Sequence, residues 1–192
     1  MFMNSKIDLN AATLVPTSPN RDAIGLTGTT LLETPNGWTP TSDLAAGDEV
    51  ETFDGGLATI LRAERFRAAP GSMIHVPGGV FDTCGALSLL PTQRVMVDFA
   101  CVEDMFDRPC VLVEAQALVG YHGIVRKTAE EAQSLFRLTF QEEELVYANT
   151  GAVLHCPGDR PFADDFFLKI SDTEAHELME MVTPSALFGI AA

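Results

Sequence analysis

The stretch "TGTTLLETPNGWTPTSDLAAGDEVETFDGG", Thr27 to Gly56, decides the fold. It contains β-favouring runs such as "TTLLET" and "DEVETF", and each run ends in turn-forming residues. Asn36-Gly37 and Asp54-Gly55 are dipeptides typical of two-residue hairpin loops, because such loops need the positive φ that Asn, Asp and Gly tolerate. The stretch therefore predicts two successive β-hairpins.

Short β-like runs continue from this stretch as far as Cys156, among them "LATILRAERF", "SMIHV", "LSLLPTQRVMVDF", "SLFRLTF" and "ELVYAN". Strands at this spacing, with no long helices between them, predict an all-β domain. One interruption is "KTAEEAQS", residues 127–134, where Thr128 and Glu131 have capping-box spacing. This segment predicts a short turn of helix.

A second helical pattern lies near the C-terminus, in "SDTEAHELMEMVTP". We expect Asp172 to cap this helix and Pro184 to end it. Its apolar positions follow helical spacing and are Ala175, Leu178, Met179 and Val182. This stripe is expected to pack on the β domain, with a partner surface as the alternative. The expected division is a flexible leader (1–22), a β domain (23–158) and a C-terminal extension (159–192) with a helix at about 172–182.

The chain of 192 residues has a net charge of −15, from 27 acidic and 12 basic residues. This charge argues against nucleic acid and anionic membranes as partners, because phosphates would be repelled. The sequence has no run of about 18 apolar residues, so no transmembrane segment is expected. The N-terminus lacks the pattern of a cleavable signal peptide. The sequence therefore predicts a cytoplasmic protein, or one secreted by a non-classical route, and leaves its oligomeric state open.

The four cysteines, Cys84, Cys101, Cys110 and Cys156, show no CxxC spacing. Without an export signal, reduced and mostly buried thiols are expected, although a disulfide between Cys101 and Cys110 stays open. No spacing matches a zinc pattern, so we expect no metal and no cofactor. The alternative is a metal site whose ligands are Cys101, Cys110, His122 and His155.

The segment from Gly25 to Gly56, "GLTGTTLLETPNGWTPTSDLAAGDEVETFDGG", resembles the start of Hint domains, the family of hedgehog proteins and inteins. It is most similar to a bacterial branch with the pattern "CFTPGTxIxTPxGxxPVExLxxGDxVxTxDGG". Further on, "LLPTQRVMV" is similar to the family's "VSPQHRVLV", and "ELVYANTGAVLHC" resembles the closing strands of an intein. The resemblance implies a horseshoe-shaped β fold with pseudo-two-fold symmetry, whose ends meet at the active site.

The resemblance also implies three chemical groups, and this sequence has replaced each of them. Gly25 stands where the family has its nucleophile, normally a Cys that attacks the preceding carbonyl, here that of Ile24. Leu90 and Gln93 stand where the family has a Thr or Ser and a His that donates a proton to the leaving nitrogen. His155 aligns with the His before the terminal Asn, and Cys156 aligns with that Asn.

None of the replacements can perform the family's chemistry. Gly25 has no side chain, Gln93 does not titrate, and Cys156 cannot form a succinimide. Thr27 is expected to hydrogen-bond a local backbone group, and Asn149-Thr150 is expected to form a turn. The sequence therefore predicts a degenerate Hint protein without splicing or autocleavage, acting as a scaffold or binding module for an unknown protein or peptide.

Two alternatives stay open. The first is autoprocessing by relocated groups, for example at Thr27 or between Asn149 and Thr150. The second is a cysteine-dependent enzyme in which Cys156 pairs with a distant His75 or His122; His155 cannot serve, because neighbouring residues in a strand point to opposite faces. If the chain only binds, a pocket is expected where the active site was lost, lined by Gly25, Gln93, His155 and Cys156.

Overall fold

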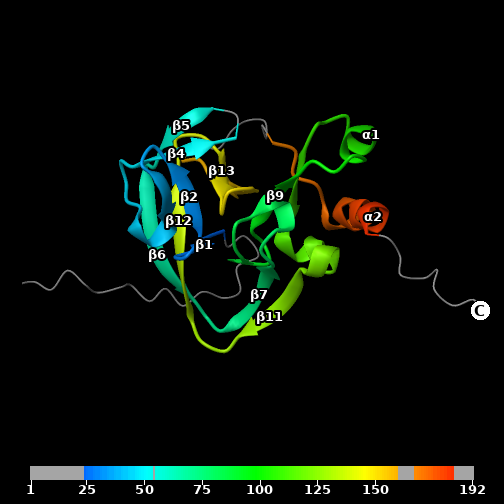
Figure 1. Ribbon diagram of the computed structural model, residues 1–192, viewed down its shortest axis with the longest axis horizontal. Helices are drawn as coiled ribbons and strands as arrows, with labels where there is room; N and C mark the ends of the chain where they lie inside the picture. The colour runs from blue at the N-terminus through cyan, green and yellow to red at the C-terminus, as the bar shows by residue number, and fades with distance from the viewer. Residues whose placement is uncertain (1–23, 54, 160–166, 184–192) are drawn as a thin grey trace, which may run out of the picture.

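The computed structural model describes residues 24–53, 55–159 and 167–183 (Figure 1). The strands are β1 (Leu26–Thr27), β2 (Leu31–Thr34), β3 (Gly37–Pro40), β4 (Glu49–Thr52), β5 (Gly56–Thr59), β6 (Arg62–Ala68), β7 (Gly71–Val76), β8 (Leu87–Leu89), β9 (Arg94–Val97), β10 (Val111–Glu114), β11 (Val125–Ala129), β12 (Gln133–Thr139), β13 (Glu144–Ala148) and β14 (Ala152–Cys156). The helices are α1 (Val102–Phe106) and α2 (Asp172–Val182), with 3-10 turns η1 (Thr41–Asp43), η2 (Val80–Asp82), η3 (Ala115–Leu118) and η4 (Tyr121–Gly123).

These strands form two antiparallel sheets. One sheet has the order β11-β7-β8-β1-β12-β6, and the other has the order β10-β9-β14-β13-β2-β3, with β4 and β5 attached through β13. The inward faces of both sheets share one apolar core, which includes Leu32, Ile74, Val113 and Leu154. The all-β prediction is therefore confirmed.

Both hairpins of the opening stretch are present. In the first, Thr34 pairs with Gly37, so the two loop residues are Pro35 and Asn36 and not Asn36-Gly37. Gly37 adopts φ of 100°, the positive φ expected of it, although it lies directly after the loop. In the second hairpin Thr52 pairs with Gly56, whose φ is 75°. The turns form where the sequence predicts them. The first loop lies one residue earlier than expected, and the second has three residues between its paired ends where two were expected.

A long two-stranded ribbon runs through the first sheet. We use "ribbon" for residues 62–76 and 125–139, in which β6 pairs with β12 and β7 pairs with β11. The β6–β12 part lies at the left of Figure 1 and the β7–β11 part at the bottom. The helix expected at 127–134 is wrong, because this segment is the end of β11, a turn, and the start of β12. Eight residues nucleate a helix poorly, whereas pairing with β6 and β7 satisfies their backbone in the ribbon.

The C-terminal extension covers one edge of the second sheet. Residues 167–170 run parallel to β10: Leu112 N–H donates to the Leu168 carbonyl at 2.8 Å, and Ile170 N–H donates to the Leu112 carbonyl at 3.2 Å. An extended segment therefore pairs with the β10 edge of this sheet. The helix α2 follows and packs against η3 and β10.

The helix α2 has the expected bounds, but its capping residue lies one position earlier than expected. Ser171 is its N-cap, and Ser171 and Glu174 form a complete capping box, which replaces the expected cap by Asp172. Its apolar stripe packs inward as predicted, with Ala175, Leu178 and Met179 in the core. Neither helix within residues 24–53, 55–159 and 167–183 is long and apolar enough to cross a membrane.

Candidate functional site

Gln93 joins the beginning of the β domain to its end. Its side-chain oxygen accepts the Gly25 N–H at 3.3 Å. Its amide nitrogen donates to the carbonyls of His155, at 2.8 Å, and of Arg94, at 3.2 Å. Gln93 lies in the turn directly before β9 and is fully buried, with 0% of its surface exposed. Three of the positions singled out from the sequence, Gly25, Gln93 and His155, therefore meet in space.

The space beside Gly25 is filled by an aromatic ring. A Cβ atom added to Gly25 would lie 2.7 Å from Phe66 Cζ, closer than nonbonded carbon atoms approach, and 3.5 Å from Leu135 Cβ. The guanidinium of Arg137 lies 5.4 Å from the centre of the Phe66 ring, and its Nε donates to the Ile24 carbonyl at 3.4 Å. A side chain at position 25 therefore requires the ring to move.

Leu90 and Thr27 have structural contacts. Leu90 packs inward, in a small apolar cluster with Met73 and Leu135. The Thr27 hydroxyl hydrogen-bonds the Thr30 hydroxyl at 3.0 Å, and not a backbone group as expected. Leu90 has no polar side-chain atom, and the contacts of the Thr27 hydroxyl are with the Thr29 and Thr30 hydroxyls.

His155 and Cys156 point to opposite faces of β14, as predicted. Cys156 belongs to the main core, and burial raises the pKa of its thiol to about 12. At neutral pH this thiol is protonated and has no access to solvent, so it is not a nucleophile. The expected pocket lined by Gly25, Gln93, His155 and Cys156 is also wrong, because a core side chain and a side chain on the opposite face cannot line the same cavity.

His155 belongs to a buried ion network that the sequence did not predict. Its Nε2 lies 3.0 Å from a Glu143 carboxylate oxygen, and the same oxygen accepts the Lys169 ammonium at 2.8 Å. Burial lowers the pKa of His155, against the opposing effect of Glu143. Burial also raises the pKa of Glu143, but the hydrogen bonds from Lys169 and His155 outweigh it, and the net pKa is lowered.

The protonation state of His155 follows from its surroundings. A neutral ring with hydrogen on Nε2 donates to Glu143 and leaves Nδ1 as a bare acceptor. Nδ1 is buried and has no hydrogen-bond partner among the described residues. A charged ring would bury an N–H at this atom without an acceptor, which is unfavourable. The network therefore holds a neutral histidine and fastens Lys169 of the extension to the sheet.

Asn149 and Thr150 form the predicted turn between β13 and β14. Both have positive φ, 46° and 79°. The Asn149 side-chain oxygen accepts the Leu31 N–H at 2.8 Å, and its backbone carbonyl accepts the Cys84 N–H at 2.8 Å. Asn149 is buried and ties three chain segments together, which is a structural role.

The four cysteines form no disulfide, and potential metal ligands do not cluster among the described residues. All four cysteines are free; Cys84 is exposed, Cys101 and Cys110 are half-buried, and only Cys156 is buried, so the expectation of mostly buried thiols is wrong. In the part of the chain that the structure describes, no group of three or more His, Cys, Asp or Glu side chains could hold a metal ion.

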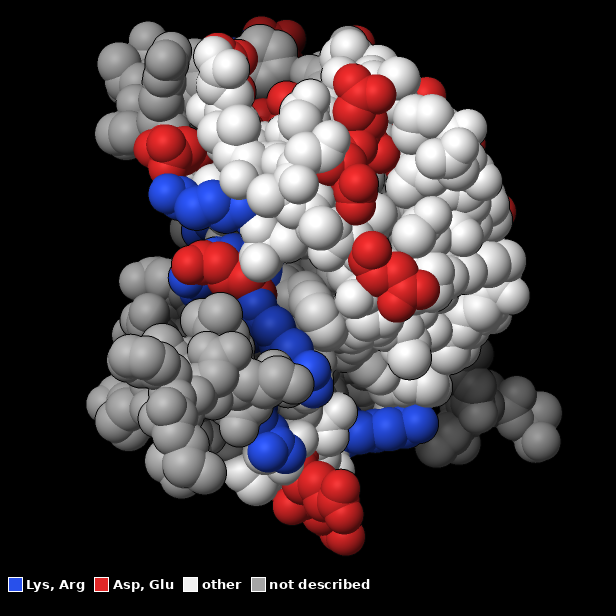
Figure 2. Space-filling model, turned by 90° about the vertical axis from the view of Figure 1, so that its left-hand side faces the viewer, with Lys and Arg blue, Asp and Glu red and all other residues white. Residues whose placement is uncertain are grey.

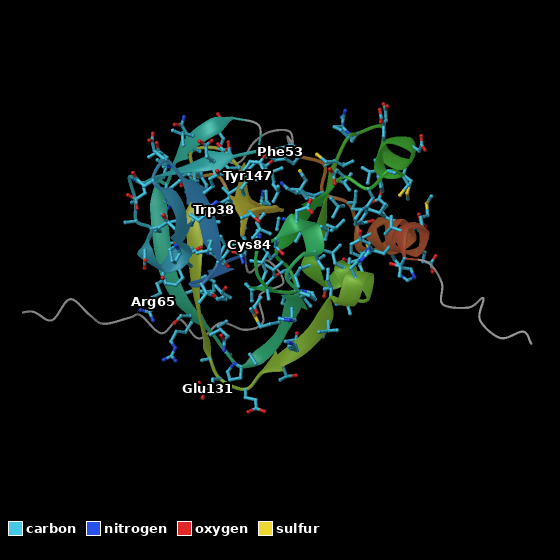
Figure 3. The ribbon with its side chains drawn as sticks, in the orientation of Figure 1. Trp38, Phe53, Arg65, Cys84, Glu131 and Tyr147 are labelled. Atoms are coloured by element: carbon cyan, nitrogen blue, oxygen red, sulfur yellow. The ribbon has the colours of Figure 1, made fainter. Side chains whose placement is uncertain are left out.

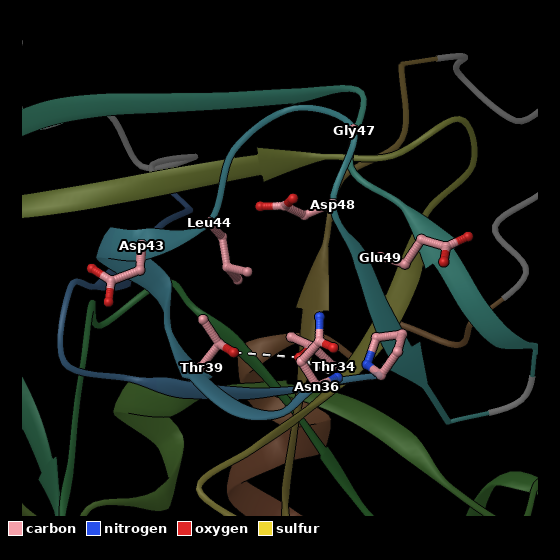
Figure 4. Close-up of a pocket in the computed structure, with 9 residues that line it drawn as sticks. Thr34, Asn36, Thr39, Asp43, Leu44, Gly47, Asp48 and Glu49 are labelled. Carbon is pink, nitrogen blue, oxygen red and sulfur yellow. Dashed lines mark hydrogen bonds between the residues drawn. The ribbon is translucent and has the colours of Figure 1, made fainter.

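Among the described residues, pockets also lie away from Gly25 and His155. The first, of about 340 Å³, lies within the opening stretch and is lined by Thr34, Pro35, Asn36, Thr39, Asp43, Leu44, Gly47, Asp48 and Glu49 (Figure 4). Its carboxylates disfavour an anionic ligand, and that of Asp48 accepts the Ala45 N–H at 2.8 Å. The second, of about 250 Å³, is mainly apolar and is lined by Phe53, Arg108, Pro109, Cys110, Val111, Leu112, Leu145, Phe167 and Leu168.

Comparison with known proteins decides the family. The sequence model for the Hint domain matches residues 24–153, which is more than half of the chain. The chain belongs to the Hint domain family. The match begins at the residue before Gly25 and ends two residues before His155. Among curated proteins, none matches the sequence.

A solved structure shows the same fold, and others are similar to this chain. The bacterial intein-like domain from Clostridium thermocellum has a TM-score of 0.53 and 14% identity, and the similarity covers 69% of this Hint protein and 99% of that domain. A splice-inactive variant of the AceL NrdHF class 3 split intein has a TM-score of 0.49 and 12% identity, covering 72% and 100% of the two chains. The similarity to the Clostridium thermocellum domain agrees with the Hint family match in assigning the fold.

Four residues around the site were not found from the sequence. Phe66 and Arg137 lie in strands far from Gly25 along the chain, and Glu143 and Lys169 surround His155. Each residue looks like an ordinary strand or turn residue by itself, because only strand pairing brings it to the site. The sequence contained no signal that could have selected them.

Proposed function

We propose that this Hint protein neither splices nor cleaves itself and that it acts as a scaffold or binding module for a protein or peptide. The observation that carries the proposal is the Gln93 side chain. It lies fully buried between Gly25 and His155 and is engaged by hydrogen bonds on both its oxygen and its nitrogen. An amide in this position holds the domain's ends together but does not titrate.

The nucleophile step has no group to perform it. Gly25 cannot attack the Ile24 carbonyl, and the Phe66 ring fills the space where a nucleophilic side chain would begin. Thr27 hydrogen-bonds other hydroxyls, and no base lies beside it among its hydrogen-bond partners. Arg137 donates to the Ile24 carbonyl, but a polarised carbonyl does not react without a nucleophile.

The release step is missing in the same way. Cys156 is in the core with a raised pKa, which also argues against the alternative of a cysteine-dependent enzyme. Asn149 is held in a turn by its side-chain and backbone hydrogen bonds. A missing general acid alone typically costs about 10²–10⁴ in rate, and here the nucleophile and the terminal Asn are missing as well.

The test measures intact mass. The full chain carries a different tag on each end and is incubated for days with and without thiol or hydroxylamine. We expect one full-length species under every condition. Fragments that end at Ile24 or Asn149, or thiol-dependent release of either tag, would refute the proposal.

A restored variant supplies the control. It combines Gly25→Cys, Leu90→Thr, Gln93→His and Cys156→Asn with Phe66→Ala, which makes room for the new side chain. If this variant cleaves itself and the natural chain does not, the replaced residues account for the absence of cleavage. Equal cleavage in both would show that the chemistry resides elsewhere.

A further inference from the structure

The ribbon has the opposite charge to the rest of the protein. It carries six of the chain's 12 basic residues, and they are Arg62, Arg65, Arg67, Arg126, Lys127 and Arg137. It carries only three acidic residues, Glu64, Glu130 and Glu131. In a chain with net charge −15, the ribbon is therefore a local region of positive charge. Figure 2 shows Lys and Arg side chains gathered along one part of the surface.

One edge of this ribbon has no strand beside it among residues 24–53, 55–159 and 167–183. In the six-stranded sheet, β6 is the last of the described strands and pairs with β12. Its seven residues, Arg62–Ala68, contain no proline and are exposed or half-buried along their whole length. A strand in this position has a row of backbone N–H and C=O groups on its outer side that another extended chain can bind.

The basic side chains alternate along this edge. Arg65 and Arg67 are two residues apart, so they extend from the same face of β6. Arg65 donates to the Ser134 hydroxyl at 3.0 Å, and its guanidinium lies 5.9 Å from the centre of the Phe136 ring. Arg67 makes no hydrogen bond or ion pair with the part of the chain that the structure describes. Figure 3 shows Arg65 at the outer side of the ribbon.

We propose that the β6 edge binds an acidic peptide as an added antiparallel or parallel strand. A peptide with a carboxylate at every second residue would direct them toward Arg65 and Arg67, while its backbone pairs with β6. Phe136 offers an apolar surface on the same face, because Phe136 pairs with Arg65. The inference rests on the proposed binding role and names the chemistry of the partner.

Charge complementarity favours a short acidic peptide over nucleic acid. A strand of seven residues spans about 23 Å, so a peptide can contact the ribbon alone. A long polyanion would extend over the remaining surface, where acidic residues dominate and repel phosphates. Arginines on an edge strand also discourage pairing between copies, so the experiment must separate recognition from this protective role.

Fluorescence anisotropy measures the binding. The probe is a fluorescein-labelled seven-residue peptide that alternates glutamate and threonine, titrated with the full chain at low salt. We expect saturable binding that weakens as salt rises, because exposed ion pairs are screened. A peptide with lysine in place of glutamate should not bind. A glutamate peptide methylated on alternate backbone nitrogens should bind at least about tenfold more weakly if strand pairing contributes.

Charge-reversal variants localise the site. The double variant Arg65→Glu/Arg67→Glu should weaken binding at least about tenfold, since like charges across an interface are strongly unfavourable. The single variant Arg67→Glu should weaken binding less. It keeps the inference testable even when the double variant does not fold. The matched control for Arg67→Glu is Arg108→Glu, which makes the same change in charge at an exposed arginine outside the ribbon. It should leave the affinity for the peptide within about twofold.

Four outcomes would overturn the inference. They are no binding of the glutamate peptide, equal binding of the N-methylated peptide, equal weakening by Arg108→Glu, and a concentration-dependent dimer that Arg67→Glu dissociates. The last outcome would assign the edge to a second copy of this chain. Intact mass of the same samples reports self-cleavage independently, so failure of the peptide inference and failure of the proposed function can be distinguished.

Discussion

Replacing Gln93 by Met tests whether this side chain holds the two ends of the domain together. Methionine has a similar volume, so the substitution removes hydrogen bonds and leaves little cavity. It takes away the acceptor of the Gly25 N–H and a donor to the His155 carbonyl, in a position with 0% exposure. Each buried polar group left unpaired costs about 1–3 kcal/mol. We expect the free energy of unfolding to fall by roughly 2–5 kcal/mol.

Urea unfolding measures this change, with circular dichroism and fluorescence as two probes of one transition. The melting temperature should fall by roughly 4–20 °C, because 1 kcal/mol corresponds to about 2–4 °C in a chain of this size. Hydrogen exchange by NMR adds a local measurement, since the Gly25 amide should lose protection more than amides of the core strands.

The control is Gln133→Met. The half-buried Gln133 donates its amide to the Glu131 carbonyl at 3.0 Å in a solvent-exposed hydrogen bond, so its loss should change stability by no more than about 0.5 kcal/mol. A loss below about 1 kcal/mol for Gln93→Met, or a loss no larger than that of the control, would refute the role given to Gln93.

Three further outcomes are expected. Gly25→Ala should destabilise the protein by about 1–3 kcal/mol through its clash with Phe66. In a double-mutant cycle, Phe66→Leu should remove most of that loss of stability. If the effects of the two substitutions simply added, the clash would be contradicted. Cys156 should react with iodoacetamide at neutral pH far more slowly in the native protein than in urea, as read by peptide mass mapping, and equal rates would disprove its burial. The pKa of His155 lies below its usual value in the folded state, so the unfolded chain takes up a proton first and stability should fall as pH drops below about 6.5. The pKa of Glu143 is also lowered, which adds a further loss below about pH 4.5. Urea unfolding across pH checks this, and His155→Gln should flatten only the upper part of the profile.

The sequence by itself determined the fold class and the family. Alternating runs broken by turn residues require strands, because the side-chain period of a strand is two and the turns need residues that tolerate positive φ. The register from Gly25 to Gly56 carried the resemblance to Hint domains, and the family match confirms it. The stripe of Ala175, Leu178 and Met179 likewise determined a helix that packs inward, because helical spacing places these residues on one face.

Only the tertiary structure decided which residues surround the site. Residues 127–134 became part of the ribbon because strands distant in sequence were available to pair with them, and tertiary pairing outweighs a short capping signal. Phe66, Arg137 and Lys169 reach Gly25 and His155 through pairing between segments that are far apart in the chain. Local sequence encodes the period and the turns of a strand, but the neighbours of a strand depend on the whole chain, and so does the burial that sets the pKa values of His155 and Cys156.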